Sequence, residues 1–386
     1  MSVTGPAGFR AAGIAAGIKE NGNRDLALVV NDGPNQAAAG VFTTNKVKAA
    51  PVLWSQQVLK ERKLRAVVLN SGCANACTGP GGFQDTHATA EKVAEVLGVG
   101  AIEIAVCSTG LIGERLPMKE VLSGVETAVE ELADSEQAGL DAATAVLTTD
   151  TKPKQALRKH SAGWSIGGFA KGAGMLAPNL ATMLSVVTTD ADISGEVLEE
   201  ALRQASRLTF DRLDVDGGTS TNDTVLVLAS GASGIAPDQE EFTELLTQVC
   251  LDLARQLQGD AEGVTKLIDI TVRGAASEDD AVRIGRTIAE DNLVKTAMFG
   301  SDPNWGRIAM ALGRVPAEIE PEKVEITVNG VTLFANGTQA RDRSEADLSG
   351  SEIDIVVDLH LGEHSATIMT TDLSHGYVEE NSAYSS

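Results

Sequence analysis

The sequence predicts an α/β protein in which helices cover sheets that are mixed or antiparallel. Segments with apolar residues at spacings of three and four alternate along the chain with short β-branched runs that stop at Gly or Asn. A second observation concerns the direction of neighbouring strands. The dipeptide Asn329–Gly330 divides the alternating run "VEITVNGVTLF" into two short strands. Asn-Gly between two strands is the signal of a two-residue hairpin, which joins antiparallel strands.

The individual elements follow from the same patterns. Strands are expected at 65–72, 102–110, 222–231 and 268–275, and helices at 87–99, 117–132, 194–210 and 238–257. The stretch "KGAGMLAPNLATMLSVVTTDA" changes character at Met183, where a β-branched, apolar run begins that suits a buried strand. Before it, Pro178 and the glycines Gly168, Gly172 and Gly174 exclude a helix and predict a loop, so that Thr182 heads the strand.

Composition limits the classes of function. A chain of 386 residues predicts two or three lobes with room for a buried cleft. The net charge of −23 argues against nucleic acid or an anionic membrane as a partner, since either requires a basic face. No run reaches the roughly 18 apolar residues of a membrane span, and the N-terminus lacks a signal-peptide pattern, so we expect a cytoplasmic protein. Buried free thiols and no metal site are expected, because no repeated CxxC pair or histidine cluster accompanies the four cysteines, Cys73, Cys77, Cys107 and Cys250.

Thr182 is a candidate nucleophile. A threonine hydroxyl needs a base, and one solution is the residue's own amine, which must then be a free chain terminus. Attack of the Thr182 hydroxyl on the carbonyl of Ala181, followed by ester hydrolysis, would create that terminus. The alternative is a threonine that simply begins a strand.

A second candidate lies in "VCSTGLIGERLPMKE", where the β-branched run ends at Cys107 and is followed by Ser108, Thr109 and Gly110. A hydroxyl beside a glycine amide can donate two convergent hydrogen bonds to an oxyanion, and each donor is worth about 3 kcal/mol. The alternative is a glycine turn with a capping threonine.

Several longer motifs resemble one family along nearly the whole chain. They are "CSTGLIGERLPM", "LTTDTKPK", "KGAGMLAPNLATML", "DGGTSTNDT", "GDAEGVTKLI", "FGSDPNWGR" and the tail "HGYVEENSAYSS". Together they resemble the ornithine acetyltransferases, the ArgJ family of arginine biosynthesis. The resemblance implies a layered fold of the ornithine acetyltransferase and DmpA-aminopeptidase type, with paired mixed sheets enclosed by helices. It also implies self-cleavage between Ala181 and Thr182 into an α chain, 1–181, and a β chain, 182–386, which assemble as an α2β2 heterotetramer.

Residue roles come from the same resemblance. Thr182 matches the nucleophile of both cleavage and acetyl transfer, and Thr109 with Gly110 matches the oxyanion hole. The positions that match substrate contacts are Thr148, Lys171, Thr182, Glu262, Asn381 and Ser386. The family commonly ends in threonine where this chain has Ser386, which puts the affinity of that contact in doubt. Tyr384 is expected to anchor the tail, because an aromatic residue is unusual at a solvated end.

Some of these residues have other interpretations. Lys171 suits the α-carboxylate of an amino-acid substrate, but it could be a solvated surface charge. Glu262 could bind the substrate ammonium, assist proton movement or be a plain charge at a helix end. In "SDPNWGR", Asn304, Trp305 and Arg307 either take part in the site or only shape its wall.

The implied reaction is a ping-pong transfer of acetyl from N2-acetylornithine to glutamate through an acetyl ester on Thr182, releasing ornithine. It needs no metal or organic cofactor, although acetyl-CoA could be a second donor. The sequence leaves open a specialised-pathway paralogue and an aminopeptidase that transfers to water. A nucleotide-binding module is a third alternative, suggested by "GGFAKGAG", but Lys171 precedes Gly172 where a phosphate loop needs the order Gly-Lys-Ser/Thr.

Overall fold

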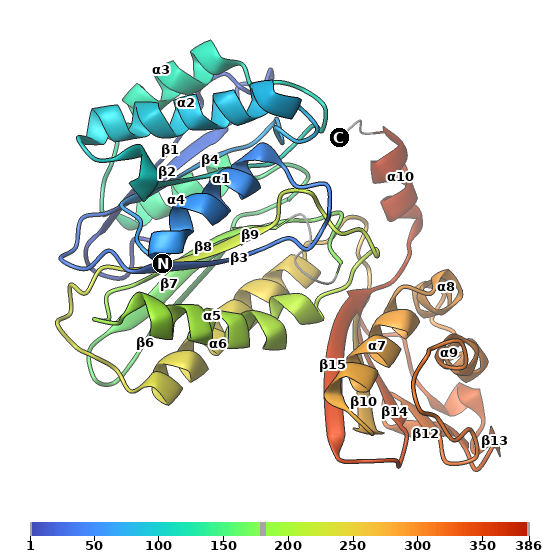
Figure 1. The fold of residues 1–386 in the computed structure, drawn as a ribbon. Helices are drawn as coiled ribbons and strands as arrows, with labels where there is room; N and C mark the ends of the chain where they lie inside the picture. Colours follow the sequence, from blue (N-terminus) through green and yellow to red (C-terminus); the bar gives the residue numbers. More distant parts are fainter. Residues whose placement is uncertain (1, 178–182, 384–386) are drawn as a thin grey trace.

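The computed structural model describes residues 2–177 and 183–383. These residues form three β-sheets of four, five and six strands, with helices packed against them (Figure 1). The first two sheets make up the larger part of the molecule, and the six-stranded sheet, formed by strands between Leu267 and Thr371, forms a smaller part. The prediction of an α/β protein with mixed sheets is confirmed.

The four-stranded sheet is built from the N-terminal third of the chain. Its order is β1 (Phe9–Ile14), β2 (Leu26–Asn31), β4 (Ala66–Asn70) and β5 (Ile104–Ser108). The helices α2 (Gly79–Leu97) and α3 (Met118–Glu130) cover its outer face, whereas α1 (Ala50–Val58) and α4 (Glu136–Ala145) lie between this sheet and the next (Figure 1). Because β4 and β5 are parallel, both strands end side by side, and Asn70 pairs with Ser108 there.

The five-stranded sheet lies below α1 and α4 in Figure 1. Its order is β3 (Ala38–Phe42), β9 (Thr224–Ala229), β8 (Leu184–Thr189), β7 (Ser165–Lys171) and β6 (Lys154–Lys159). Side chains alternate between its faces, as strand geometry requires. Val186 joins the core shared with the first sheet, whereas Val187 packs in the cluster under α5 (Gly195–Leu208) and α6 (Gln239–Gln258).

One end of the five-stranded sheet brings together three segments. At this end Lys171, the last residue of β7, pairs with Leu184, the first residue of β8. Leu184 also pairs with Thr224, the first residue of the parallel strand β9. The end of β5 lies nearby, because the side chain of Asn222 donates a 2.8 Å hydrogen bond to the carbonyl of Ser108. The predicted site residues therefore converge between the ends of two sheets.

The six-stranded sheet has its own apolar core. Its order is β13 (Thr338–Gln339), β12 (Val331–Ala335), β11 (Glu325–Val328), β14 (Glu352–Asp358), β10 (Leu267–Ala275) and β15 (His364–Thr371). It packs with α7 (Glu278–Ala289), α8 (Asn292–Phe299) and α9 (Trp305–Leu312). After β15, α10 (His375–Ala383) returns towards the larger part of the molecule (Figure 1). Short 3₁₀ turns occur at Leu59–Glu61, Ala101–Glu103, Phe210–Arg212 and Arg343–Glu345.

The predicted hairpin is confirmed: Asn329 and Gly330 connect β11 to β12 with φ angles of 44° and 77°. The four predicted helices correspond to α2, α3, α5 and α6, although α2 begins earlier than predicted, at Gly79. The glycines of its first turns hide the periodic pattern there.

The loop predicted around the glycines is partly wrong, because Gly168 lies in β7. A β-carbon there would lie 2.7 Å from the carbonyl oxygen of Val186, so glycine allows β7 to pack closely on β8. The loop itself starts at Gly172. Pro178, Ala181 and Thr182 lie outside the described residues, and so does the expected division between residues 181 and 182.

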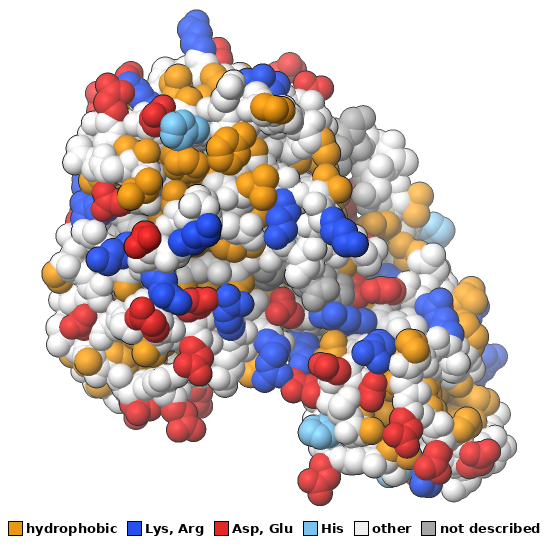
Figure 2. All heavy atoms as spheres, viewed as in Figure 1, with side chains coloured by type: hydrophobic (Ala, Val, Ile, Leu, Met, Phe, Trp, Pro, Cys, Tyr) orange, Lys and Arg blue, Asp and Glu red, His pale blue; other side chains and the backbone are white. Residues whose placement is uncertain are grey.

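Three of the cysteines are buried as expected, and burial raises the pKa of Cys107 and of Cys250 to about 12. The expectation is wrong for Cys77, which is exposed in a turn with a φ of 58° just before α2. Acidic side chains are spread over both parts of the molecule, in keeping with its net charge of −23 (Figure 2). None of the helices in the described ranges combines the length and apolar character needed to cross a bilayer.

Candidate active site

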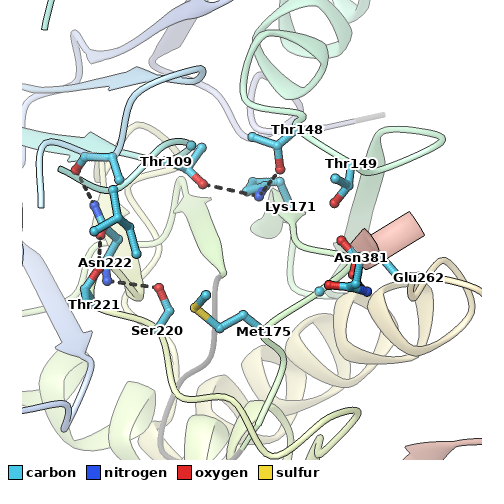
Figure 3. Close-up of a pocket in the computed structure, with 14 residues that line it drawn as sticks. Thr109, Thr148, Thr149, Lys171, Met175, Ser220, Thr221, Asn222, Glu262 and Asn381 are labelled. Atoms are coloured by element: carbon cyan, nitrogen blue, oxygen red, sulfur yellow. Dashed lines mark hydrogen bonds between the residues drawn. The ribbon is translucent and has the colours of Figure 1, made fainter. Parts of the chain in front are cut away.

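A pocket opens between the ends of the four-stranded and five-stranded sheets (Figure 3). Its walls come from the loop after β5, the end of β7, the loops before β9 and after α6, and the helix α10. Hydroxyl, amide and charged side chains make up most of this lining, which consists of Ala74, Thr109, Gly110, Ile112, Thr148, Thr149, Lys171, Gly174, Met175, Ser220, Thr221, Asn222, Glu262 and Asn381.

Lys171 supplies a buried ammonium group to the pocket. Its side chain is 1% exposed, and Nζ donates to Oγ1 of Thr148 at 2.8 Å and to Oγ1 of Thr109 at 3.3 Å (Figure 3). A carboxylate oxygen of Asp150 lies 3.6 Å from the same nitrogen. Burial lowers the pKa of Lys171, and the charge of Asp150 opposes this shift. The interpretation of Lys171 as a solvated surface charge is therefore wrong.

The charge of Lys171 is balanced by a buried network. Asp150 accepts hydrogen bonds from Nζ of Lys154 at 2.5 Å and from the backbone N–H of Gly172 at 2.6 Å. Lys154 also donates to Asp260 at 2.6 Å. Burial alone would raise the pKa of Asp150, but the charges of Lys171 and Lys154 lower it to about 2. Asp150 is therefore an anion at neutral pH and fixes both lysines.

Thr109 and Gly110 present two donors to the pocket. The lysine ammonium donates to the Thr109 oxygen, which leaves the hydroxyl proton free to point elsewhere, and this hydroxyl has no acceptor among the described residues. The N–H of Gly110 likewise makes no hydrogen bond within residues 2–177 and 183–383. A β-carbon at Gly110, where φ is 128°, would lie 2.3 Å from the carbonyl carbon of Gly72. Only glycine fits this loop.

Glu262 and Asn381 form the opposite side of the pocket. Nδ2 of Asn381, on α10, donates to Oε2 of Glu262 at 2.9 Å, while the N–H of Glu262 donates to the carbonyl of Ala173 at 3.0 Å. A β-carbon at Gly174 would lie 2.3 Å from Oε2 of Glu262, so the glycine-rich loop leaves space for this carboxylate. The tail helix, the loop after α6 and the loop after β7 thus meet at one point.

The structure brings together most of the predicted site residues: Thr109, Gly110, Thr148, Lys171, Glu262 and Asn381 all line the pocket. Ala181, Thr182, Tyr384 and Ser386 lie outside the described residues. Met183, the residue after Thr182, is buried, and its N–H donates to Oδ1 of Asp223 at 2.9 Å. Position 182 is therefore tied by one peptide bond to a fixed point near the pocket.

Residues of "SDPNWGR" are not part of the pocket lining. Asn304 caps α9 by accepting the N–H of Arg307, and Trp305 stacks on Phe334 with ring centroids 5.0 Å apart. Arg307 donates to the carbonyl of Leu293 at 2.6 Å. These contacts stabilise the smaller part of the molecule.

Sequence reasoning missed several residues of the site. Ser220, Thr221 and Asn222 line the pocket, and Asp150 holds Lys171 from behind it. The signal for the first three was present, since they lie in the motif "DGGTSTNDT", which we used for the resemblance without assigning a role. Asp150 gave no separate signal within "LTTDT".

Comparison with known proteins decides the family. The model of the ArgJ family matches residues 10–386. This chain belongs to the ArgJ family. Among curated ArgJ relatives, the "Arginine biosynthesis bifunctional protein ArgJ" of Mycolicibacterium paratuberculosis is 63% identical over 391 aligned positions, which cover all of this chain and 97% of the relative. The protein of the same name from Streptomyces coelicolor is 59% identical over 386 positions, with both chains covered in full.

A solved structure of an ornithine acetyltransferase is also similar in sequence. The ornithine acetyltransferase of Mycobacterium tuberculosis, solved in complex with ornithine, is 64% identical over 47% of this chain and 96% of its own, with a TM-score of 0.46. In the chain described here, the pocket is lined by the two residues predicted for an oxyanion hole, Thr109 and Gly110, and by most of the residues predicted to contact substrate.

We expect replacement of Asp150 by Asn to change the acid stability of the protein. The pKa of Asp150 falls from 3.8 to about 2 on folding, so its contribution to stability is present above 3.8 and is lost as the pH falls towards 2. This shift corresponds to about 2 kcal/mol. Unfolding by urea, measured between pH 5 and pH 2, should show a shallower loss of stability in Asp150→Asn than in the wild type. Parallel pH profiles for the two proteins would contradict the ionised network.

Proposed function

We propose that this ArgJ protein transfers the acetyl group of N2-acetylornithine to glutamate and so acts in arginine biosynthesis. The observation that carries the proposal is the pair of free donors, the Thr109 hydroxyl and the Gly110 N–H, directed into a pocket beside a buried ammonium. Such a pair suits the oxyanion that forms when a nucleophile attacks an acetyl carbonyl. Membership of the ArgJ family indicates the reaction, and the donors and the ammonium of the pocket are suited to it.

The nucleophile in this proposal is Thr182, freed by self-cleavage after Ala181. Its hydroxyl attacks the carbonyl of Ala181, the peptide nitrogen leaves as the new amine, and water hydrolyses the resulting ester. The fixed position of Met183 near the pocket supports this role, because it limits where residue 182 can lie. The products are the chains 1–181 and 182–386.

The topology explains why two such chains would stay together. In the five-stranded sheet, β9 from the second chain pairs with β3 from the first, and β8 from the second pairs with β7 from the first. Separation of the chains would break both ladders and expose the buried faces of β8 and β9. We also expect two copies of each chain to assemble, as an α2β2 heterotetramer.

Acetyl transfer would proceed in two half-reactions. The Thr182 hydroxyl attacks the acetyl carbonyl while the free amine of Thr182 takes its proton, and the oxyanion is stabilised by Thr109 and Gly110. The C–N bond then breaks, ornithine leaves with a proton, and an acetyl ester remains on Thr182. In the second half the amine of glutamate attacks this ester, which regenerates the threonine hydroxyl. No step requires a metal or organic cofactor.

Charges in the pocket fit amino-acid substrates. Lys171 and Thr148 together offer an ammonium and a hydroxyl to an α-carboxylate. Glu262 is suited to an ammonium, since Asn381 donates to its Oε2 while Oε1 makes no hydrogen bond within the described part of the chain. We therefore favour ammonium binding over proton transfer for Glu262. Asn381 positions this carboxylate, and Ser386 at the chain terminus would add a further contact.

Two questions of substrate choice belong to the same proposal. The relatives are named bifunctional, which supports a second activity, and acetyl-CoA is the second acetyl donor to be tested with glutamate. An aminopeptidase that uses water as acceptor would release free acetate and form no N-acetylglutamate. Product analysis with both donors separates these activities.

Replacement of Thr182 by Ala should leave one full-length chain without transferase activity, because the alanine has no hydroxyl for either reaction. Thr182→Ser keeps the hydroxyl on the same carbon and should still produce two chains. Mass spectrometry of the purified proteins gives the cleavage point, and a new N-terminus other than Thr182 in the wild type would overturn the assignment.

Replacement of Thr109 by Ala should slow both self-cleavage and transfer by about two to three orders of magnitude, because both reactions pass through an oxyanion at the same place. Thr109→Ser retains the hydroxyl and is the matched control. Rates of precursor loss and of N-acetylglutamate formation provide the measurements. Loss of transfer with unchanged cleavage would indicate separate sites.

A further inference from the structure

The turn that leads into β9 connects the four-stranded and five-stranded sheets at the pocket. We refer to residues 220–223 as the β9 entry turn. Asn222 within it is buried, and both N–H groups of its amide are used, since Nδ2 donates to the carbonyl of Ala74 at 2.6 Å and of Ser108 at 2.8 Å. Its Oδ1 accepts the hydroxyl of Thr221 at 2.6 Å (Figure 3). The orientation of this side chain is therefore fixed by three contacts.

Both carbonyls that Asn222 contacts belong to the support of the oxyanion donors. Ser108 directly precedes Thr109, and Ala74 follows Cys73, which forms bridges to Thr109 and to Leu111 on either side of Gly110. One amide thus holds both segments of the loop that presents the Thr109 hydroxyl and the Gly110 N–H.

The next residue in the chain holds the other half of the site. Oδ1 of Asp223 accepts the N–H of Met183 at 2.9 Å, and the N–H of Thr224 donates to the Met183 carbonyl at 3.0 Å. Met183 is therefore fixed on both sides, and residue 182 is attached to it by the next peptide bond. Asn222 and Asp223 therefore reach two different elements from adjacent positions in this turn.

Asp223 has a feature that a purely structural contact does not explain. The residue is completely buried, and no hydrogen bond of good geometry reaches its Oδ2 from the described residues. Burial raises the pKa of this carboxyl, and the nearby Lys171 charge and the Ser220 hydroxyl only partly oppose the shift. Leaving a buried carboxyl oxygen unpaired is unfavourable for stability. A donor at position 182, either the threonine hydroxyl or the amine formed by cleavage, would satisfy it.

We propose that Asn222 and Asp223 are positioning residues that set the distance between the nucleophile and the oxyanion donors. Asn222 acts through Ser108 and Ala74 on Thr109 and Gly110, whereas Asp223 acts through Met183 on Thr182. This inference rests on the proposed function, because it takes Thr182 as the nucleophile. Two adjacent residues of the second chain would thus align groups from both chains.

The fold offers matched controls at the opposite ends of the same strands. Asn31 is buried and donates from Nδ2 to the carbonyls of Asn35 at 3.1 Å and Ala229 at 3.0 Å, at the far end of β9. Asp190 accepts the N–H of Ser165 at 2.7 Å, just beyond the far end of β8. Both residues make structural bonds and do not line the pocket, and Asp190, unlike Asp223, uses both carboxyl oxygens, because Oδ2 accepts from the N–H of Ala7 and the hydroxyl of Ser165.

The test compares Asn222→Asp with Asn31→Asp in the full-length protein. Both substitutions keep the side-chain size and replace two donations to carbonyls by repulsion, so both should lower the melting temperature. Only Asn222→Asp should lower kcat for acetyl transfer, by about 10- to 100-fold, because a small displacement of reacting groups costs about this much. KM should change little, because Lys171, Thr148 and Glu262 remain in place. Equal kcat values for the two folded variants would overturn the role of Asn222.

A second pair, Asp223→Asn and Asp190→Asn, tests the other half of the proposal. Asparagine at 223 can still accept the Met183 N–H through its single oxygen, but it has no second acceptor oxygen in place of Oδ2 for residue 182. Self-cleavage, followed as the fraction of precursor left after a fixed time of expression, should slow about 10-fold or more in Asp223→Asn. It should be unchanged in Asp190→Asn. Wild-type rates of cleavage in Asp223→Asn would overturn the role of Asp223.

These experiments also distinguish a failure of this inference from a failure of the proposed function. Wild-type protein that cleaves itself but forms no N-acetylglutamate would refute acetyl transfer. The comparison of self-cleavage in Asp223→Asn and Asp190→Asn would still test the role of Asp223. Wild-type protein that neither cleaves nor transfers would overturn both. If Asn222→Asp does not fold, Asn222→Ala and Asn31→Ala give the same comparison without the added charge.

Discussion

The buried ammonium of Lys171 is the group on which the arrangement of the pocket depends. A charge that is 1% exposed needs compensation, and it receives a carboxylate, Asp150, together with the hydroxyls of Thr109 and Thr148. Asp150 in turn is shared with Lys154, which reaches Asp260. The network joins β6, β7 and the loops before and after them, so the charged floor of the pocket is rigid. This rigidity matters because the neutral donors above it must be aligned before any substrate arrives.

The rest of the fold places complementary groups around this floor. Two sheets end at the same point, the larger one supplying Lys171 and the entry to β9, the smaller one supplying the loop with Thr109 and Gly110. The tail helix α10 adds Asn381 from a distant part of the chain. Two positions of the site have no room for a β-carbon and therefore need glycine. Gly110 packs against the backbone of Gly72, and Gly174 packs against the carboxylate of Glu262. In the mechanism we propose, the strands β9 and β8 of the second chain lie between strands β3 and β7 of the first chain in one sheet, so that cleavage would free an amine without loosening the site.

Elements with a strong local pattern could be predicted from the sequence. The helices α5 and α6 and the hairpin at Asn329–Gly330 follow from periodicity and turn chemistry. By contrast, the glycines of β7 are typical of a loop when only the local sequence is considered. In the folded protein they lie in a strand, because the neighbouring strand β8 packs too closely for a larger side chain at Gly168. Site residues were found where a motif carried them, as with Thr109 and Lys171. Asp150 and Asn222 were not found, because their roles depend on contacts with segments that lie far away in the sequence, such as Asp150 with Lys171 and Asn222 with Ser108. Burial of Lys171 likewise cannot be inferred from its neighbours in sequence.

The central claim is that acetyl passes through Thr182 at the donors formed by Thr109 and Gly110. The most direct measurement is mass spectrometry of the protein after it is mixed with N2-acetylornithine in the absence of glutamate and the products are separated under acid. The account predicts that the 182–386 chain gains the mass of one acetyl group, that fragmentation places the group on Thr182, and that addition of glutamate removes it. A chain that turns over the substrate without this adduct, or an acetyl group located on another residue such as Lys171, would contradict the account.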